Sequence, residues 1–343
     1  MAGAWHAAGQ VWPAFVLVGG LLLVGVVAEE DGLFAAAGTA LARAPGGTRA
    51  AYVLSLALVV CVTAVLNLDT SVFFLTPVLL HLARARRVDE APFLYGSVFM
   101  ANSASLFLPG SNLTNLIVLH GEHVSGATFF TRMVGSALTA VLVTALVLIL
   151  TFRRELGARG AASSERVPVQ VGIGLAAVAA STVAVLALAS PALPVLGIGL
   201  AAVALRRVHR ARIAAVLDLR LLVGLFAVAV LLGALGRAWT GPAGLLGRLG
   251  RVGTAAGGAV AAIAVNNLPA SVLLTPHPPE HARALLLGLN LGPNLAVTGS
   301  LSAFLWLRVA RALDARPSIR MYSRIGAVLV PVSLAASLAA LYL

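Results

Sequence analysis

The stretch ANSASLFLPGSNLTNLIVL, residues 101–119, has no charged residue and lies between long apolar runs, so it is predicted to lie in a membrane. It nevertheless holds three asparagines, three serines and a threonine around Pro109-Gly110, a pair that should break a helix. A helix that unwinds in lipid frees backbone groups, which must be buried in protein or line a hydrated cavity. Short amide and hydroxyl side chains can satisfy that backbone and also bind a solute. The stretch therefore predicts a broken membrane helix at a binding site.

The composition of the whole chain supports the same environment. Of 343 residues, 60% are hydrophobic and 10% are charged, and the mean hydropathy is +0.98. Apolar runs long enough to cross a bilayer recur along the chain, which soluble domains do not show. Abundant alanine and glycine suit close helix packing in lipid. The fold class predicted is an all-α polytopic membrane protein.

The basic residues indicate orientation rather than a nucleic-acid partner. All 24 are arginines, and most lie in short loops between apolar runs, as in 84–87, 153–154 and 206–212. Cytoplasmic loops of membrane proteins collect arginine and lysine in this way. We therefore expect a multi-pass protein of the cell inner (plasma) membrane whose macromolecular surroundings are lipid and not nucleic acid.

One apolar segment is too long for a single crossing. Segment 50–83 has about 34 residues, is interrupted at Asn67-Leu68-Asp69, and has arginines on both flanks. A re-entrant hairpin with a polar tip near mid-membrane satisfies this pattern. Counting crossings makes 252–276 a second hairpin that enters from the opposite side. The loop containing Arg237, Arg248 and Arg251 does not follow the arginine pattern, and it is predicted to be an interfacial helix.

The two halves of the chain repeat one pattern. AVLNLDTSVFFLTP (64–77) matches IAVNNLPASVLLTP (263–276), and an asparagine-rich broken helix follows each. Inverted repeats with broken helices are typical of secondary transporters, which bind their substrate between the copies. The domains predicted are a first inverted repeat at 1–152 (hairpin 50–83, broken helix 92–120), a connecting helix pair at 153–216, and a second inverted repeat at 217–343 (hairpin 252–276, broken helix 284–308).

Four polar breaks are expected to meet near the bilayer midplane: 67–70, 111–115, 266–267 and 290–300. Half-helix N-termini there would offer partial positive charge to substrate oxygens. Asp69 is the acid placed deepest in an apolar segment, where burying a charge costs about 2.5–3.5 kcal/mol or more. It is therefore a candidate for proton exchange. Alternatively, it caps the helical arm that starts at Thr70.

Several stretches resemble the arsenite-efflux permease family (arsenical pump membrane protein) of the ion transporter superfamily, which is related to sodium/proton antiporters and divalent-anion symporters. They are LNLDTSVFFLTPVLL, ANSASLFLPGSNLTNL, NNLPA and LGLNLGPNLAVTGSLSAFLWLR. The resemblance implies the inverted-repeat fold of that superfamily, with two re-entrant hairpins and two broken helices around one site. It also implies substrate- or ion-binding roles for Asn67, Asp69, Thr70, Ser111, Asn112, Asn266, Asn267, Asn294, Thr298 and Ser300. The polar breaks add Asn115 and Asn290 to this set.

Two features depart from that family. Leu68 stands where relatives often have asparagine, and two N-terminal helices expected from the repeat are missing before residue 12. The function predicted is secondary active transport, with proton-coupled efflux of arsenite or antimonite, because neutral arsenite suits a site of amides and hydroxyls. The alternatives are a sodium- or proton-coupled carboxylate or anion transporter, a sodium/proton antiporter, and an inactive truncated homologue.

No enzyme signature, metal site or cofactor is predicted. The chain lacks a nucleophile–base pair and a phosphate-binding loop, and its single cysteine, Cys61, cannot form an internal disulfide. The partners expected are a small inorganic or organic solute and a coupling ion, H+ or Na+. A homodimer and an association with a cytosolic arsenite-pump ATPase are left open by the resemblance.

Overall fold

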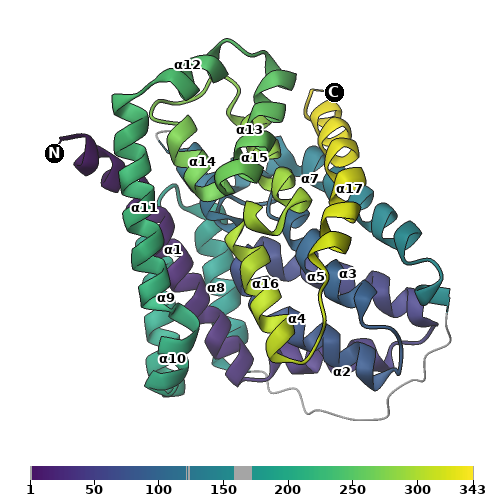
Figure 1. The fold of residues 1–343 in the computed structure, drawn as a ribbon. Coiled ribbons are helices and arrows are strands. Elements are labelled where there is room, and N and C mark those ends of the chain that lie inside the picture. The colour runs from purple at the N-terminus through teal and green to yellow at the C-terminus, as the bar shows by residue number, and fades with distance from the viewer. Residues whose placement is uncertain (1, 121, 123, 158–171, 343) are drawn as a thin grey trace.

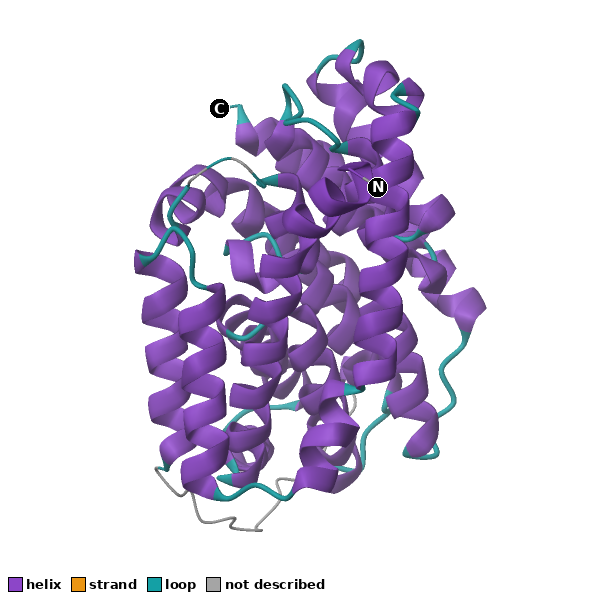
Figure 2. Cartoon of the chain, turned by 90° about the vertical axis from the view of Figure 1, so that its left-hand side faces the viewer, coloured by secondary structure: helices purple, strands orange, loops and turns teal. Residues whose placement is uncertain are grey.

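The computed structural model describes residues 2–120, 122, 124–157 and 172–342, so part of the predicted loop at 153–166 lies outside the described residues. This described part folds into helices without a strand (Figure 2). The elements are α1 (Ala2–Glu30), α2 (Leu33–Arg43), α3 (Thr48–Val65), α4 (Leu68–Ala85), α5 (Ala91–Ala104), η1 (Pro109–Ser111), α6 (Leu113–Val118), α7 (Gly126–Thr151), η2 (Glu155–Gly157), α8 (Ile173–Ala187), α9 (Ala192–Arg206), α10 (Arg210–Leu217), α11 (Leu219–Ala238), α12 (Gly241–Gly247), α13 (Arg251–Val265), α14 (Asn267–Leu274), α15 (Ala282–Leu291), η3 (Gly292–Leu295), η4 (Val297–Gly299), α16 (Leu301–Ala312) and α17 (Ile319–Leu341).

Within the described ranges, six helical segments are long and apolar enough to cross a membrane, in agreement with the predicted polytopic class. Several of them expose large apolar side chains, including Leu142 on α7 and Leu231 on α11. Water would not favour such surfaces, but lipid does. The chain is therefore a multi-pass membrane protein.

The helices break where the sequence places polar or proline residues. α3 ends before Asn67 and α13 ends before Asn266, while α5 and α15 give way to short 3-10 turns before α6 and α16. Both halves thus show a long helix, a short helix, a helix pair, a broken helix and a closing long helix. The boundaries and the inverted orientation assigned to the two repeats remain predictions.

The pair α3–α4 and the pair α13–α14 each begin and end at the same end of the protein, and the two pairs do so at opposite ends of α1. The 29 residues of α1 span about 43 Å. At the end that carries Asp31, Arg86 after α4 donates to the carbonyls of Leu41 and Ala44 at the end of α2, the helix that precedes α3, at 3.1 and 2.8 Å. At the other end, Gln10 Nε2 donates to the carbonyl of Thr275, directly after α14, at 2.9 Å. In Figure 1 the Asp31 end, with α2 and α10, is below, and α12 is above. Re-entry of these pairs into a bilayer remains a prediction.

Ion pairs collect at the Asp31 end. Arg206 Nε lies 2.6 Å from Asp31 Oδ1, and Arg212 Nη2 lies 2.6 Å from Glu29 Oε2. Residues 206–212, which we interpreted as a loop, include the start of α10, so that interpretation was wrong in part. The segment RARIAAVL is rich in good helix formers, and Asp218 ends it in a left-handed conformation.

Two of the three exceptional arginines at the other end, Arg237 and Arg251, have partners within the described protein. Arg237 Nη2 donates to Gln10 Oε1 at 2.8 Å, and the guanidinium of Arg251 lies 4.1 Å from the ring centroid of Tyr342. Between these two arginines the chain forms α12. Internal contacts therefore account for two of the three positive charges on the side that the arginine pattern disfavours, while Arg248 is exposed.

Candidate functional site

Four half-helices begin at the polar breaks, and each is capped by a side chain from the break. Asn67 Oδ1 accepts from the Thr70 amide at 2.7 Å, and Asn112 Oδ1 accepts from the Thr114 amide at 3.1 Å. The second half repeats the arrangement. Asn266 accepts from the amide of Leu268 at the start of α14, and Ser300 accepts from the amide of Ala303 at the start of α16. Such caps satisfy one of the amide groups that a helix start leaves unpaired.

The same four N-termini surround one small cavity. Its volume is about 10 Å³, room for one water molecule. Each of α4, α6, α14 and α16 contributes residues from its first turn or its cap, and the complete lining is Leu68, Asp69, Asn112, Leu113, Asn267, Leu268, Ser300, Leu301 and Ser302. Segments more than 200 residues apart in sequence therefore meet here, as the four breaks predicted.

Beside this cavity, Asn290 holds the two broken helices together. Its Oδ1 accepts from Asn112 Nδ2 at 2.6 Å and from Ser105 Oγ at 2.7 Å, and its Nδ2 donates to Asn115 Oδ1 at 2.9 Å. Asn290 is 1% exposed, and Asn115 in turn donates to the carbonyl of Leu108 in the break. The amide groups thus satisfy both each other and the unwound backbone, as residues 101–119 suggested.

A second asparagine pair joins the same helices. Asn102 Nδ2 donates to Asn294 Oδ1 at 2.8 Å. The other amide atoms of this pair, Asn102 Oδ1 and Asn294 Nδ2, are buried and have no partner within the described residues. Asn67 Nδ2 is buried and unpaired in the same sense. Buried polar atoms are normally hydrogen-bonded, so these atoms have capacity for a polar ligand.

Not every predicted site residue faces the cavity. Thr70 is buried and its methyl group faces Gly25 of α1, whereas Ser111 Oγ donates to the Ala64 carbonyl at 3.0 Å. Thr298 is exposed and takes part through its carbonyl, which accepts from Asn266 Nδ2 at 3.0 Å. These three residues support the breaks rather than line the cavity.

Asp69 is the only charged side chain among the described residues that line the cavity. The alternative that Asp69 caps α4 was wrong, because Asn67 accepts the Thr70 amide and Asp69 lies one residue inside the helix. Its carboxylate forms no hydrogen bond or ion pair with the rest of the described chain. It is therefore left facing the four helix starts.

Sequence reasoning missed three residues of this region. Asn102 and Ser105 are one helical turn apart and reach Asn294 and Asn290, while Ser302 lines the cavity and bonds Ser300. The three-residue spacing of Asn102 and Ser105 places both on one face, and that spacing was the available signal.

Aromatic side chains of α5, α16 and α17 pack around the break between α15 and α16. Tyr322 Oη donates to the Pro293 carbonyl at 3.0 Å, and its ring stacks on Phe99 with centroids 4.6 Å apart. Trp306 Nε1 donates to the Leu94 carbonyl at 2.8 Å. α17 can approach the break because Gly326 has no side chain to meet the Asn294 carbonyl. The position of Asn294 is thus set by α5, α16 and α17 together.

Comparison with known proteins supports a membrane transporter. A solved structure, that of the Alcanivorax borkumensis YdaH transporter, is similar at a TM-score of 0.59 and 14% identity, with 98% of this chain and 86% of that chain covered. At that identity the likeness concerns the fold. The profile of the citrate transporter family, CitMHS, matches residues 4–305. This chain is therefore a member of the CitMHS citrate transporter family, a membrane transporter and not an enzyme.

Proposed function

We propose that the chain is a secondary active transporter that moves a small carboxylate anion together with H+ or Na+. The observation that carries the proposal is the meeting of four capped half-helix N-termini around a cavity with one acidic side chain. Helix N-termini carry partial positive charge and unpaired amides, which favour a carboxylate. The family description, citrate transporter, names a substrate of this class.

Asp69 supplies a reason for coupling. An anion bound beside an ionised Asp69 is repelled, by roughly 4 kcal/mol for unit charges 4 Å apart at an effective dielectric constant of 20. A proton or sodium ion on Asp69 removes that repulsion. Substrate and cation therefore each strengthen the binding of the other, which favours their transport together.

Proton-coupled export of arsenite or antimonite is the second candidate. It is favoured by the uncharged amides and hydroxyls around the cavity and by the absence of arginine and lysine from its described lining. Neutral arsenite needs no compensating cation, so a proton and the solute would compete for Asp69 and bind in alternate steps. The two candidates thus predict opposite effects of the cation on solute affinity.

Transport by the purified chain in proteoliposomes tests both. Labelled citrate and arsenite are compared under imposed proton and sodium gradients, with Asp69→Asn beside Glu280→Gln. Glu280 is an acid outside the lining of this cavity, and its side chain is 75% exposed, so its variant is a matched control.

For carboxylate symport, saturating cation should strengthen citrate binding, and Asp69→Asn should bind citrate without cation yet lose gradient-driven accumulation. For arsenite export, the cation should weaken solute binding. Gradient-driven transport by Asp69→Asn at the wild-type rate would remove Asp69 from the coupling step. Movement of neither solute under either gradient would refute both candidates.

In this proposal the Asp31 end, which holds the arginine-rich segments, faces the cytoplasm. The Gln10 end then faces outward.

A further inference from the structure

The four half-helices form two pairs that run from the cavity toward opposite ends of the protein. The first pair is α6 with α14, and the second pair is α4 with α16. α6 and α14 pack together, and both end near Gln10. α4 and α16 also pack together, and both end near Arg84 at the Asp31 end. Each pair combines one arm of a helix hairpin with one half of a broken helix, and the two members come from different halves of the chain.

Gln10 of α1 joins the outer ends of the first pair. Its Nε2 donates to the Thr275 carbonyl at 2.9 Å and approaches the Ile117 carbonyl at 3.5 Å. Its Oε1 accepts from Arg237 Nη2 at 2.8 Å, and Arg237 Nη1 donates to the Gly233 carbonyl of α11. Gln10 is only 4% exposed. The ends of α6 and α14 are thereby tied to α1 and α11, helices that contribute nothing to the substrate cavity.

Arg84, in the last turn of α4, joins the end of the second pair to Glu90, the residue before α5. Its Nη2 donates to the Leu313 carbonyl at the end of α16, at 2.8 Å, and its Nε lies 2.7 Å from Glu90 Oε1. Both side chains of this ion pair are about one-third exposed, at 39% and 32%. Solvent weakens exposed ion pairs, so this contact should hold less firmly than the buried one at Gln10.

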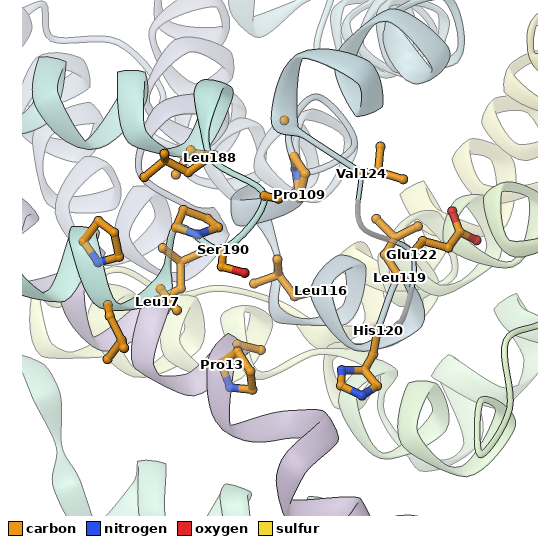
Figure 3. Close-up of a pocket in the computed structure, with 18 of the residues that line it drawn as sticks. Pro13, Leu17, Pro109, Leu116, Leu119, His120, Glu122, Val124, Leu188 and Ser190 are labelled. Atoms are coloured by element: carbon orange, nitrogen blue, oxygen red, sulfur yellow. The ribbon is translucent and has the colours of Figure 1, made fainter.

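A large cavity lies directly beyond the first pair. It has a volume of about 510 Å³, is lined by Gln10, Pro109 and Leu116 among others, and lies at the Gln10 end. In Figure 3, Pro13 and Leu17 of α1 face Pro109 and Leu116 of the broken helix across it. Leu113 lines the substrate cavity and Leu116 lines this outer cavity, and one turn of α6, about 5 Å of rise, separates them.

We propose that Gln10, held by Arg237, is an outer clasp whose release lets α6 and α14 move away from α1 and connects the substrate cavity with the outer cavity. Arg84 with Glu90 forms the corresponding inner clasp on α4 and α16. Alternating opening of the two clasps gives the site access to one side at a time. This inference rests on the proposed transport function for its purpose, but its residues and its test do not depend on the substrate.

The test measures how fast a cysteine in the substrate cavity reacts with a membrane-impermeant maleimide. The reporter is Ser302→Cys, a buried position of the cavity lining, in a Cys61→Ala background that removes the exposed native thiol. Reagent is applied to the Gln10 side in whole cells and to the Asp31 side in everted vesicles. Gln10→Leu removes the outer clasp. Ser190→Ala, which alters a polar residue of the same outer cavity without touching the clasp, is the matched control.

Gln10→Leu should raise labelling from the Gln10 side by about tenfold or more, the shift that corresponds to about 1.4 kcal/mol for a lost hydrogen bond to a charged group. Labelling from the Asp31 side should not rise, and Ser190→Ala should behave as wild type. Arg84→Met should have the mirror effect, raising labelling from the Asp31 side by a smaller factor.

Gln10→Glu is a second test of the clasp. The carboxylate keeps the contact with Arg237, but it places an oxygen, which cannot donate, beside the Thr275 carbonyl. This variant should therefore also raise labelling from the Gln10 side. Wild-type labelling in folded, monodisperse Gln10→Leu and Gln10→Glu proteins, or an equal rise from both sides, would overturn the clasp. Failure of citrate or arsenite transport with the predicted labelling pattern would instead count against the proposed substrate alone.

Discussion

Replacing Asn290 with alanine tests whether the amide network joins the two halves of the chain. The change removes four side-chain hydrogen bonds: three to Ser105, Asn112 and Asn115, at donor–acceptor distances of 2.7, 2.6 and 2.9 Å, and one to the Leu286 carbonyl at 2.8 Å. Side-chain hydrogen bonds within membrane proteins contribute about 0.6 kcal/mol on average and about 1.7 kcal/mol at most. For four bonds the free energy of unfolding should therefore fall by about 2.4 kcal/mol, with an upper limit of about 7 kcal/mol.

Reversible unfolding in mixed detergent micelles measures this free energy. Ser136→Ala is the matched control, because Ser136 is buried but its hydroxyl has no partner within the described chain, so its loss should cost little. Ser105→Ala removes a hydroxyl whose single proton is shared between Asn290 Oδ1 and the Asn102 carbonyl, and it should lower the free energy by about 0.6 kcal/mol. The double variant Asn112→Ala, Asn290→Ala should be less destabilised than the sum of its singles, because both lose the same bond.

Two results would refute the reasoning. A loss in Asn290→Ala within about 0.5 kcal/mol of the Ser136→Ala control would place it in the range of ordinary surface substitutions. Strict additivity of Asn112→Ala and Asn290→Ala, within about 0.3 kcal/mol, would mean that the two residues do not share a bond.

Three further predictions concern the site and its surroundings. Asn112→Ala and Asn294→Ala should each abolish solute transport in proteoliposomes while size-exclusion chromatography still shows folded protein; transport at the wild-type rate by either would remove that residue from the site. Cysteines replacing Arg49 and Arg84 should react with impermeant reagent from the same side of the membrane, because they flank one helix pair; reaction from opposite sides would exclude a re-entrant hairpin. Gly326→Ala places a methyl group against the Asn294 carbonyl and should destabilise the protein by about 1–3 kcal/mol in the micelle unfolding assay, whereas wild-type stability would show that α17 does not pack on the break.

The sequence by itself determined the membrane class, the positions of the breaks and the residue types around them. Apolar runs of spanning length leave few alternatives to helices, because a bilayer offers no partner to an exposed backbone. Pro109-Gly110, and asparagines such as Asn67 and Asn112, end one helix and cap the next through contacts only a few residues away. Local chemistry of this kind can be read from neighbouring residues.

Only the tertiary structure decided which polar residues meet. Asn290 pairs with Asn112 across 178 residues, and Gln10 with Thr275 across 265, and no local pattern predicts either contact. Thr298 turned outward, whereas Ser302, which was not predicted, lines the cavity. In soluble proteins the exposed face of a helix reveals its orientation, but α5 is buried from Pro92 to Ala104. Where every face of a helix contacts protein, its sequence has no polar face to orient it, and the packing of its neighbours decides which side chain reaches the site.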